Sequence, residues 1–111
     1  MRLCQGPRAW REYIAATGTG DRPDTTTYPG LFTVYQKNIG PFLLPEYGVY
    51  VSHWVAFDEE HDNGFHSMPL DRWGRVLDNR LGRAVSHGCI RTGNPAAVFE
   101  FAEFGMKVLV R

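Results

Sequence analysis

Glycine and proline punctuate this 111-residue chain at short intervals. Its 12 glycines and 7 prolines are spread along the sequence rather than gathered into one linker. Between them lie short runs rich in β-branched and aromatic residues, a pattern typical of strands. We expect strands in the runs 10–17, 31–37, 49–57, in a short run ending at His66, and in 106–111. A chain of this length holds one hydrophobic core, so residues 1–111 are expected to form a single, mainly β domain.

The run 49–57 is apolar on both of its faces. Side chains alternate in direction along a strand, so the odd positions, with Val55, share one face and the even positions, with Trp54, share the other. A strand that is apolar on both faces is typical of the interior of a sheet. The run 31–37 follows a Tyr28-Pro29-Gly30 turn and is expected to pair with a neighbouring strand.

One helix is expected near the C-terminus. Asn94 can cap it, Pro95 suits its first position, and Gly105 suits the position just past its last turn. Apolar residues at positions 97, 98, 101, 102 and 104 give it a face that can pack on a sheet. The stretch 58–86 is expected to be mostly loop, and so long a loop in a small domain is usually functional.

The composition excludes several classes of protein. The 12 basic residues cancel the 12 acidic ones, so no global basic field favours nucleic acid, and 43% hydrophobic residues argue against disorder. No apolar run reaches the length of a membrane span, and no secretory leader follows Met1. Two cysteines, Cys4 and Cys89, leave three possibilities: one disulfide, two inert core thiols, or a nucleophile among them.

The hexapeptide Ser86-His87-Gly88-Cys89-Ile90-Arg91 is the most informative part of the sequence. A thiol nucleophile needs a base or cation nearby, main-chain N–H groups for an oxyanion, and access to substrate. Gly88 permits a sharp turn that can aim successive N–H groups at one point. Such dense polarity is unlike the surroundings of a cysteine in a hydrophobic core, so Cys89 is the candidate nucleophile.

Four histidines compete for the role of base. His66 ends a predicted short strand and opens the loop that returns to Cys89, which makes it the candidate. His53 on an apolar strand is expected to be structural, and His61 lies in the charged run 58–62, which is typical of a solvated loop. His87 adjoins the cysteine in sequence and is expected to have a supporting role.

Taken together, these motifs resemble the active-site signature of the L,D-transpeptidases, the YkuD-like enzymes of peptidoglycan cross-linking. The resemblance rests on the run 86–91 and on Gly64-Phe65-His66-Ser67. It extends over Ala16-Thr17-Gly18, the run 28–34, and Leu81-Gly82-Arg83-Ala84-Val85 before the cysteine. Compared with the family pattern, the segment between His66 and Ser86 is longer, and Thr27-Tyr28-Pro29 replaces a plain Thr-Pro.

The resemblance implies a β-sandwich with one packed helix, and an opening hairpin that is largely missing, because residues 1–6 supply only its tail. It also implies that a Cys89 thiolate attacks a peptide carbonyl and that His66 exchanges protons with it. The Ser67 carbonyl would orient the imidazole. The main-chain N–H groups of His87, Gly88 and Cys89 would bind the oxyanion, with Ser86 supporting the turn.

The implied reaction is a two-step acyl transfer. Cys89 would attack the L,D-peptide bond of a tetrapeptide stem and release D-Ala, and an amine or water would then take the acyl group. The implied partners are peptidoglycan stem peptides and carbapenem-type inhibitors, without nucleic acid, metal or cofactor. The protein would act as a monomer outside the cytoplasmic membrane.

Charge placement supports an anionic substrate. From position 72 to 91 there are five arginines against one acidic residue, Asp78, and arginine binds carboxylates bidentately. Arg91, two residues after the nucleophile, is assigned to substrate, and Arg83 and Trp73 are further candidates. Trp73 on a long loop is nearly as well explained by packing on the surface.

Three alternatives remain open on the sequence alone. A metal-binding module would use His53, His66, His87 and Cys89, although these lack the usual paired spacing of zinc ligands. A cysteine peptidase or amidase of other specificity would keep Cys89 and His66. An inactive cell-wall-binding domain is the third, and the missing hairpin is its best argument.

Overall fold

The computed structural model describes residues 1–5, 8–81 and 84–111. Within them, strands predominate, joined by one α-helix, α1 (Pro95–Phe101), and a short 3-10 helix, η1 (Pro23–Thr25). The strands are β1 (Arg2–Gln5), β2 (Arg8–Glu12), β3 (Ala15–Gly18), β4 (Gly30–Thr33), β5 (Gln36–Asn38), β6 (Phe42–Leu44), β7 (Val49–Val51), β8 (Trp54–Asp58), β9 (Asn63–His66), β10 (Ala84–Ser86), β11 (Ile90–Thr92) and β12 (Lys107–Val110). The expected mainly β class with one helix near the C-terminus is confirmed.

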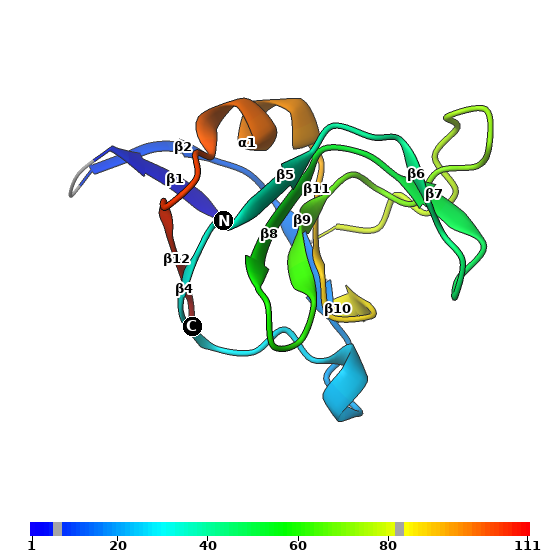
Figure 1. The fold of residues 1–111 in the computed structure, drawn as a ribbon, viewed down its shortest axis with the longest axis horizontal. Helices are drawn as coiled ribbons and strands as arrows, with labels where there is room; N and C mark the ends of the chain where they lie inside the picture. Colours follow the sequence, from blue (N-terminus) through cyan, green and yellow to red (C-terminus); the bar gives the residue numbers. More distant parts are fainter. Residues whose placement is uncertain (6–7, 82–83) are drawn as a thin grey trace.

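A six-stranded sheet with the order β10-β3-β11-β9-β8-β5 forms the centre of the molecule (Figure 1). β11 lies between β3 and β9, parallel to β9 and antiparallel to β3. In this register Arg91 stands opposite His66 and Ile90 opposite Phe65. Two segments that are far apart in the sequence, each carrying a predicted site residue, are therefore neighbours in the sheet.

The core lies between this sheet, α1 and the β4–β12 pair. Its buried residues include Val34, Val55, Phe57, Phe65 and Ile90. The helix packs against β9 and β11 and covers the sheet at the top of Figure 1. Apolar residues of β4 and β12 pack against the same cluster, so β9 and β11 are held rigidly from one side while their other face is left for a site.

The expected strands 10–17, 31–37 and 49–57 are each divided in two. The run 49–57 breaks at His53, whose φ of 56° interrupts the pleat, so β7 pairs with β6 while β8 pairs with β9 and β5. The run 31–37 breaks because β4 pairs with β12 and β5 pairs with β8, in different sheets. The expected interior strand is confirmed for β8.

The opening hairpin is present, contrary to expectation. β1 and β2 pair antiparallel. The sequence predicted a single strand over 10–17, but its first half forms β2 and only its second half enters the main sheet as β3. A hairpin of its own thus precedes the sheet, and the argument from a missing hairpin for an inactive domain is lost.

The helix ends earlier than the sequence predicts. Ala102 already has extended backbone angles, and Phe104, expected in the core, is 69% exposed. The reason lies in the following strand pairing, because the Gly105 N–H donates to the Val34 carbonyl at 2.9 Å and draws the chain toward β4. Gly105, with a φ of 83°, makes the turn into β12 rather than closing the helix.

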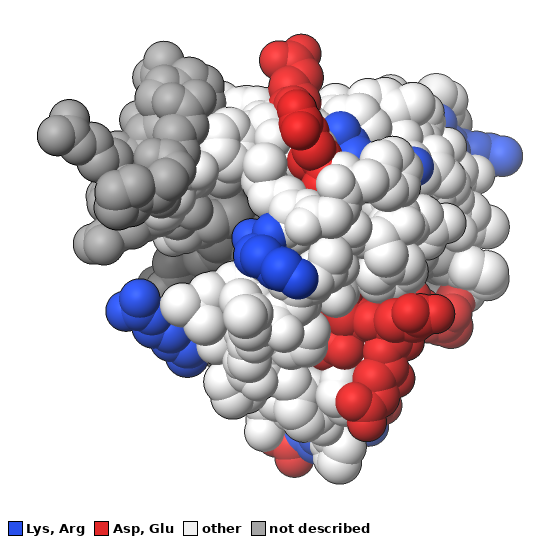
Figure 2. All heavy atoms as spheres, turned by 60° about the vertical axis from the view of Figure 1, so that its left-hand side comes forward, with Lys and Arg blue, Asp and Glu red and all other residues white. Residues whose placement is uncertain are grey.

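The segment 67–81 is a loop apart from isolated bridges that join Leu70 to Tyr50 and Val76. The expected long loop before the cysteine is thus found in the described part of that stretch. No helix among the described residues is long and apolar enough to cross a membrane. On the face drawn in Figure 2, acidic side chains gather in small groups and basic side chains lie apart from one another.

Candidate active site

Cys89 closes a tight turn between β10 and β11. Gly88 has a φ of 119°, a conformation that side chains disfavour, and a Cβ placed there would lie 2.6 Å from the Asn63 Oδ1. The Ser86 hydroxyl braces the turn by donating to the Cys89 carbonyl and accepting from the Gly88 N–H at 3.2 Å. Of the three N–H groups expected to bind an oxyanion, that of Gly88 is therefore engaged in this resting structure.

His66 ends β9 and is buried, with 6% of its surface exposed. Its Nδ1 lies 2.5 Å from the Ser67 carbonyl. A carbonyl oxygen only accepts, so Nδ1 carries the proton and Nε2 is the basic nitrogen. The Ser67 hydroxyl donates to the Met68 carbonyl at 2.8 Å and accepts from the Ser52 N–H at 3.0 Å. These bonds fix the loop that orients the imidazole.

One cavity of about 700 Å³ brings the predicted residues together. Cys89, His66, Arg91, Ser86 and His87 all line it. The β6–β7 hairpin forms much of its apolar wall, with Phe42, Leu44, Tyr47, Val49 and Val51. The Tyr47 ring stacks on His87 at 4.1 Å between centroids, so this hairpin rests on the turn that carries the nucleophile.

The resting thiol and imidazole are both neutral. Burial lowers the pKa of His66 to about 4, and the positive charge of Arg91 acts in the same direction. Burial raises the pKa of the Cys89 thiol to about 12; the Gly64 N–H opposes this rise and the Asp62 carboxylate adds to it. These displaced pKa values favour a thiol and an uncharged base at neutral pH, whereas the resemblance implies attack by a Cys89 thiolate.

Arg91 is held by a residue that sequence reasoning missed. Its Nη1 donates to the Asp78 carboxylate at 2.8 Å, and only 8% of the Arg91 surface is exposed. Asp78 also binds the Arg80 guanidinium through bonds of 2.9 and 2.8 Å. Hydrogen bonds from Arg80 and then Arg91 hold the pKa of the Asp78 carboxyl well below its usual range. The sequence shows Asp78 only as the single acidic residue among five arginines, and this pattern does not indicate which arginines it binds.

Thr27 is a second residue that the sequence analysis does not assign to the site. It holds the turn that carries Cys89. Its hydroxyl donates to the Gly88 carbonyl and accepts from the Gly18 N–H at 2.8 Å. A Cβ on Gly18 would lie 2.8 Å from the Gly88 Cα, so the two backbones touch. The run of three threonines at 25–27 is visible in the sequence, but nothing local marks its third member.

The two remaining substrate candidates do not join the site. Trp73 is 71% exposed, lies between the guanidinium groups of Arg72 and Arg75 at 5.3 and 5.2 Å, and is not among the described residues that line the cavity. Its position fits the alternative of surface packing. Arg83 lies outside the described residues.

The four residues of the metal-module alternative do not lie at one place, because His66, His87 and Cys89 line the main cavity and His53 does not. His53 lies on a separate cavity, where its Nδ1 bonds the Ser52 hydroxyl at 2.8 Å and its ring meets Phe99 edge-on. Among the described residues, no three His, Cys, Asp or Glu side chains are grouped so as to hold a metal ion. His61, expected in a solvated loop, is half-buried, bonds the Asp58 carboxylate at 2.9 Å and lines the main cavity.

Comparison with known families decides the identity of this fold. A model of the L,D-transpeptidase catalytic domain, YkuD, matches residues 1–110. The chain belongs to this family. YciB of Bacillus subtilis (strain 168), which is assigned to the L,D-transpeptidases by name, is 28% identical over 102 residues, covering 87% of this chain and 53% of YciB.

Solved L,D-transpeptidases share the fold of this L,D-transpeptidase domain. The enzyme from Stackebrandtia nassauensis matches with a TM-score of 0.70 at 20% identity, over 99% of this chain and 49% of its own. LdtMt1, solved in complex with imipenem, matches with a TM-score of 0.64 at 23% identity, over 94% of this chain and 50% of its own. The chain thus spans about half the length of these relatives.

Proposed function

We propose that this L,D-transpeptidase domain cleaves the L,D-peptide bond of a peptidoglycan tetrapeptide stem with Cys89 as nucleophile and transfers the acyl group to an amine. The observation that carries the proposal is the meeting of Cys89, His66 and Arg91 in one cavity. Family membership supports the reaction class. The roles of individual residues rest on their positions.

Acylation begins with Cys89 as an uncharged thiol and His66 as an uncharged imidazole. The sulfur attacks the carbonyl carbon between the third residue and the terminal D-Ala while its proton passes to the His66 Nε2. The carbonyl oxygen becomes an oxyanion facing the N–H groups of the turn 87–89. The C–N bond then breaks, the imidazolium returns the proton to the leaving amine, and D-Ala departs.

Transfer reverses the same proton movements. An acceptor amine attacks the thioester carbonyl and gives a proton to the His66 Nε2. The C–S bond breaks, Cys89 recovers that proton as a thiol, and a new amide leaves the cavity. With water as the acceptor, the product is the shortened stem and the enzyme acts as a carboxypeptidase.

Arg91 supplies the recognition of an anionic donor. Asp78 occupies one of its N–H groups, and a guanidinium has five. Because Arg91 lines the cavity beside Cys89, its remaining donors can bind a stem carboxylate near the reacting bond. We also propose that the domain acts outside the cytoplasmic membrane, where substrates of this kind lie. We further propose that it acts as a monomer.

Covalent trapping by a carbapenem tests the proposal, because such a compound would acylate Cys89, and imipenem is the ligand in the LdtMt1 complex. Intact mass is expected to show one adduct in the wild type and in Cys4→Ser, whose altered cysteine is exposed and does not line the cavity. Cys89→Ala is expected to form none. His66→Gln, which lacks the base, is expected to acylate at least 100-fold more slowly.

Turnover of defined tetrapeptide stems completes this test. Mass-resolved products are expected to show released D-Ala together with a cross-linked or shortened stem. A wild-type protein that takes up neither carbapenem nor stem in reducing buffer would contradict the proposal. An adduct that survives Cys89→Ala would contradict the assignment of the nucleophile.

A further inference from the structure

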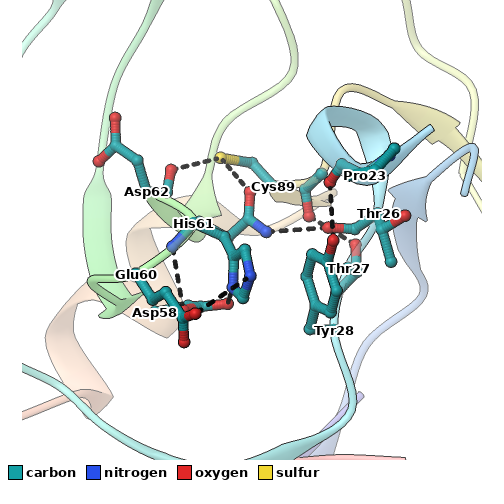
Figure 3. A network of polar contacts seen from close by, with 11 residues as sticks. Pro23, Thr26, Thr27, Tyr28, Asp58, Glu60, His61, Asp62 and Cys89 are labelled. Carbon is teal, nitrogen blue, oxygen red and sulfur yellow. Dashed lines mark hydrogen bonds and ion pairs between the residues drawn. The ribbon is translucent and has the colours of Figure 1, made fainter.

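Asn63 contacts Cys89, the proposed nucleophile. It is the first residue of β9, 4% exposed, and lines the cavity. Its Oδ1 lies 3.9 Å from the Cys89 Sγ, and its Nδ2 donates to the Thr26 carbonyl at 3.0 Å. The Sγ also lies 3.8 Å from the Asp62 carbonyl. Figure 3 shows Cys89 and Asp62 on one side of this network and Thr26 and Thr27 on the other.

The orientation of the Asn63 amide is fixed by its partners. The Thr26 carbonyl can only accept, so the NH₂ group must face it and Oδ1 must face the sulfur. An oxygen in that place accepts a hydrogen bond from a thiol and repels a thiolate. The Asp62 carbonyl oxygen likewise accepts a hydrogen bond from a thiol and repels a thiolate. The resting S–H of Cys89 is thus directed at two acceptors.

Packing makes the same side chain a wall of the turn. A Cβ on Gly88 would lie 2.6 Å from the Asn63 Oδ1, so the amide lies directly against the Gly88 backbone. The Thr27 hydroxyl, from a distant part of the chain, donates a hydrogen bond to the Gly88 carbonyl. Between them, the two side chains leave the turn little freedom to shift.

We propose that Asn63 is a positioning residue for Cys89: its Oδ1 accepts a hydrogen bond from the thiol and holds the sulfur in place, while its Nδ2 donates to the Thr26 carbonyl and so ties this contact to the Thr26 backbone. The inference deepens the proposed function, on which its catalytic meaning rests. A neutral amide suits this place because it directs the S–H without adding a charge. An aspartate of the same shape would add a full negative charge beside the sulfur.

Other charged and titratable groups face the same cavity, so the test must isolate Asn63. Asp62 and Arg91 act on the Cys89 pKa directly, in opposite directions. The further groups that line the cavity are Asp24, Glu46, Tyr47, His61, His66, Asp78 and His87. All of them are unchanged in a comparison of position-63 variants.

The experiment is alkylation of Cys89 by iodoacetamide, followed by intact mass across pH 7–9 in a Cys4→Ser background. The reagent reacts with the thiolate, whose fraction falls tenfold for each unit by which the pKa rises. Asn63→Asp is expected to slow alkylation at least fivefold at every pH. A merely structural role predicts the reverse, because loosening the site would hydrate the thiol and lower its pKa.

Controls and a second variant keep the outcome decisive. Asn94→Asp makes the same substitution at an exposed helix cap, where aspartate caps equally well, and is expected to alkylate at the wild-type rate. Asn63→Ser keeps a small polar group but loses the reach to Cys89, so alkylation is expected to rise while carbapenem acylation falls. Near-UV circular dichroism establishes that each variant is folded. If Asn63→Asp is not, Asn63→Ser carries the test, because faster alkylation with an unchanged near-UV spectrum reports the loss of the Oδ1 contact, whereas a loosened site would change that spectrum as well.

The proposal is overturned if folded Asn63→Asp alkylates as fast as the wild type or faster, or if Asn63→Ser changes neither rate. Iodoacetamide needs no L,D-transpeptidase activity. A slowed Asn63→Asp in a protein that no carbapenem or stem acylates would therefore support the contact while rejecting the proposed function. The two failures are distinguishable.

Discussion

At the scale of single residues, the site is organised around two uncharged partners. The imidazole of His66 is buried and the thiol of Cys89 is half-buried, and their pKa values are displaced in opposite directions, to about 4 and about 12. A standing thiolate–imidazolium pair would require the reverse displacement of both. The proton is therefore expected to move during attack, and Nε2 is available to take it because Nδ1 is occupied by Ser67.

The displaced pKa of His66 makes the fold sensitive to acid. Between its ordinary value of 6.5 and about 4, the unfolded chain binds a proton that the native protein refuses, so the free energy of unfolding falls as the pH falls. At 1.36 kcal/mol per unit, this loss amounts to about 2–3 kcal/mol between pH 7 and pH 4.5. Urea unfolding is expected to show it in the wild type.

The matched variant is His66→Gln, which has no titrating group at this position. Its free energy of unfolding is expected to change less over the same interval, because the two proteins are otherwise identical. An equal loss in both would show that His66 does not refuse the proton.

The sequence predicts Cys89 and His66 as the candidate reactive residues, and it does not indicate the residues that hold them. Cys89 and His66 stand in short local motifs that bear the marks of their chemistry. The partners of the missed residues lie far along the chain: Thr27 reaches Gly88 across 61 positions and Asn63 reaches Cys89 across 26. Nothing in a threonine or asparagine alone indicates such a contact, which only the sheet register creates.

At the scale of elements, the β6–β7 hairpin rests on the active turn through one aromatic contact. Tyr47 is 44% exposed yet stacks on His87 at an interplanar angle of 18°. Such a stack contributes about 1 kcal/mol, enough to bias the hairpin toward the cavity. The apolar wall of the cavity depends on that placement.

Loss of the stack is expected to slow acylation. Tyr47→Ala should lower the second-order rate of carbapenem acylation about threefold to tenfold, measured by stopped-flow absorbance. Leu43→Ala, on the same hairpin and 47% exposed, should leave the rate unchanged. Equal effects of both substitutions would indicate a general loosening of the hairpin and contradict a specific role for the stack.

Element boundaries were the weakest part of the sequence-based prediction. The alternation of side chains correctly predicts that the runs 31–37 and 49–57 are extended. It does not indicate where the chain leaves one sheet and enters another. Both runs break where the chain passes from one sheet to the next, at Val34-Tyr35 and at Ser52-His53. The helix is shortened by Val34, a residue some 70 positions earlier, through its pairing with Gly105.

At the scale of the whole molecule, one core supports the sheet that carries the site. Val55 on β8 is fully buried within it. Val55→Ala is expected to lower the free energy of unfolding by about 2 kcal/mol, from lost burial and the cavity left behind. Urea unfolding measures this change.

Carbapenem acylation by the same variant is expected to stay near the wild-type rate at 25 °C, because the core lies on the opposite face of β9 from the site. A rate that falls in proportion to the lost stability, in protein that remains folded, would show that the core and the site are mechanically coupled.

The fold class could be predicted because it depends on local patterns repeated along the chain. Short β-branched runs, frequent breakers and one capped helix are compatible with few architectures. Pairing β11 parallel to β9, with β3 on its other side, is a long-range choice that no local pattern encodes. That choice is what brings Cys89 and His66 to one cavity.

Burial of the Cys89 thiol also protects it from oxidation. Peroxides and disulfides react with thiolates, and a cysteine whose pKa lies near 12 offers almost none at neutral pH. Cys4 on β1 is exposed by contrast. Under oxidising conditions, damage or a disulfide between two copies is expected to begin at Cys4, while the Cys89 thiol is expected to stay reduced.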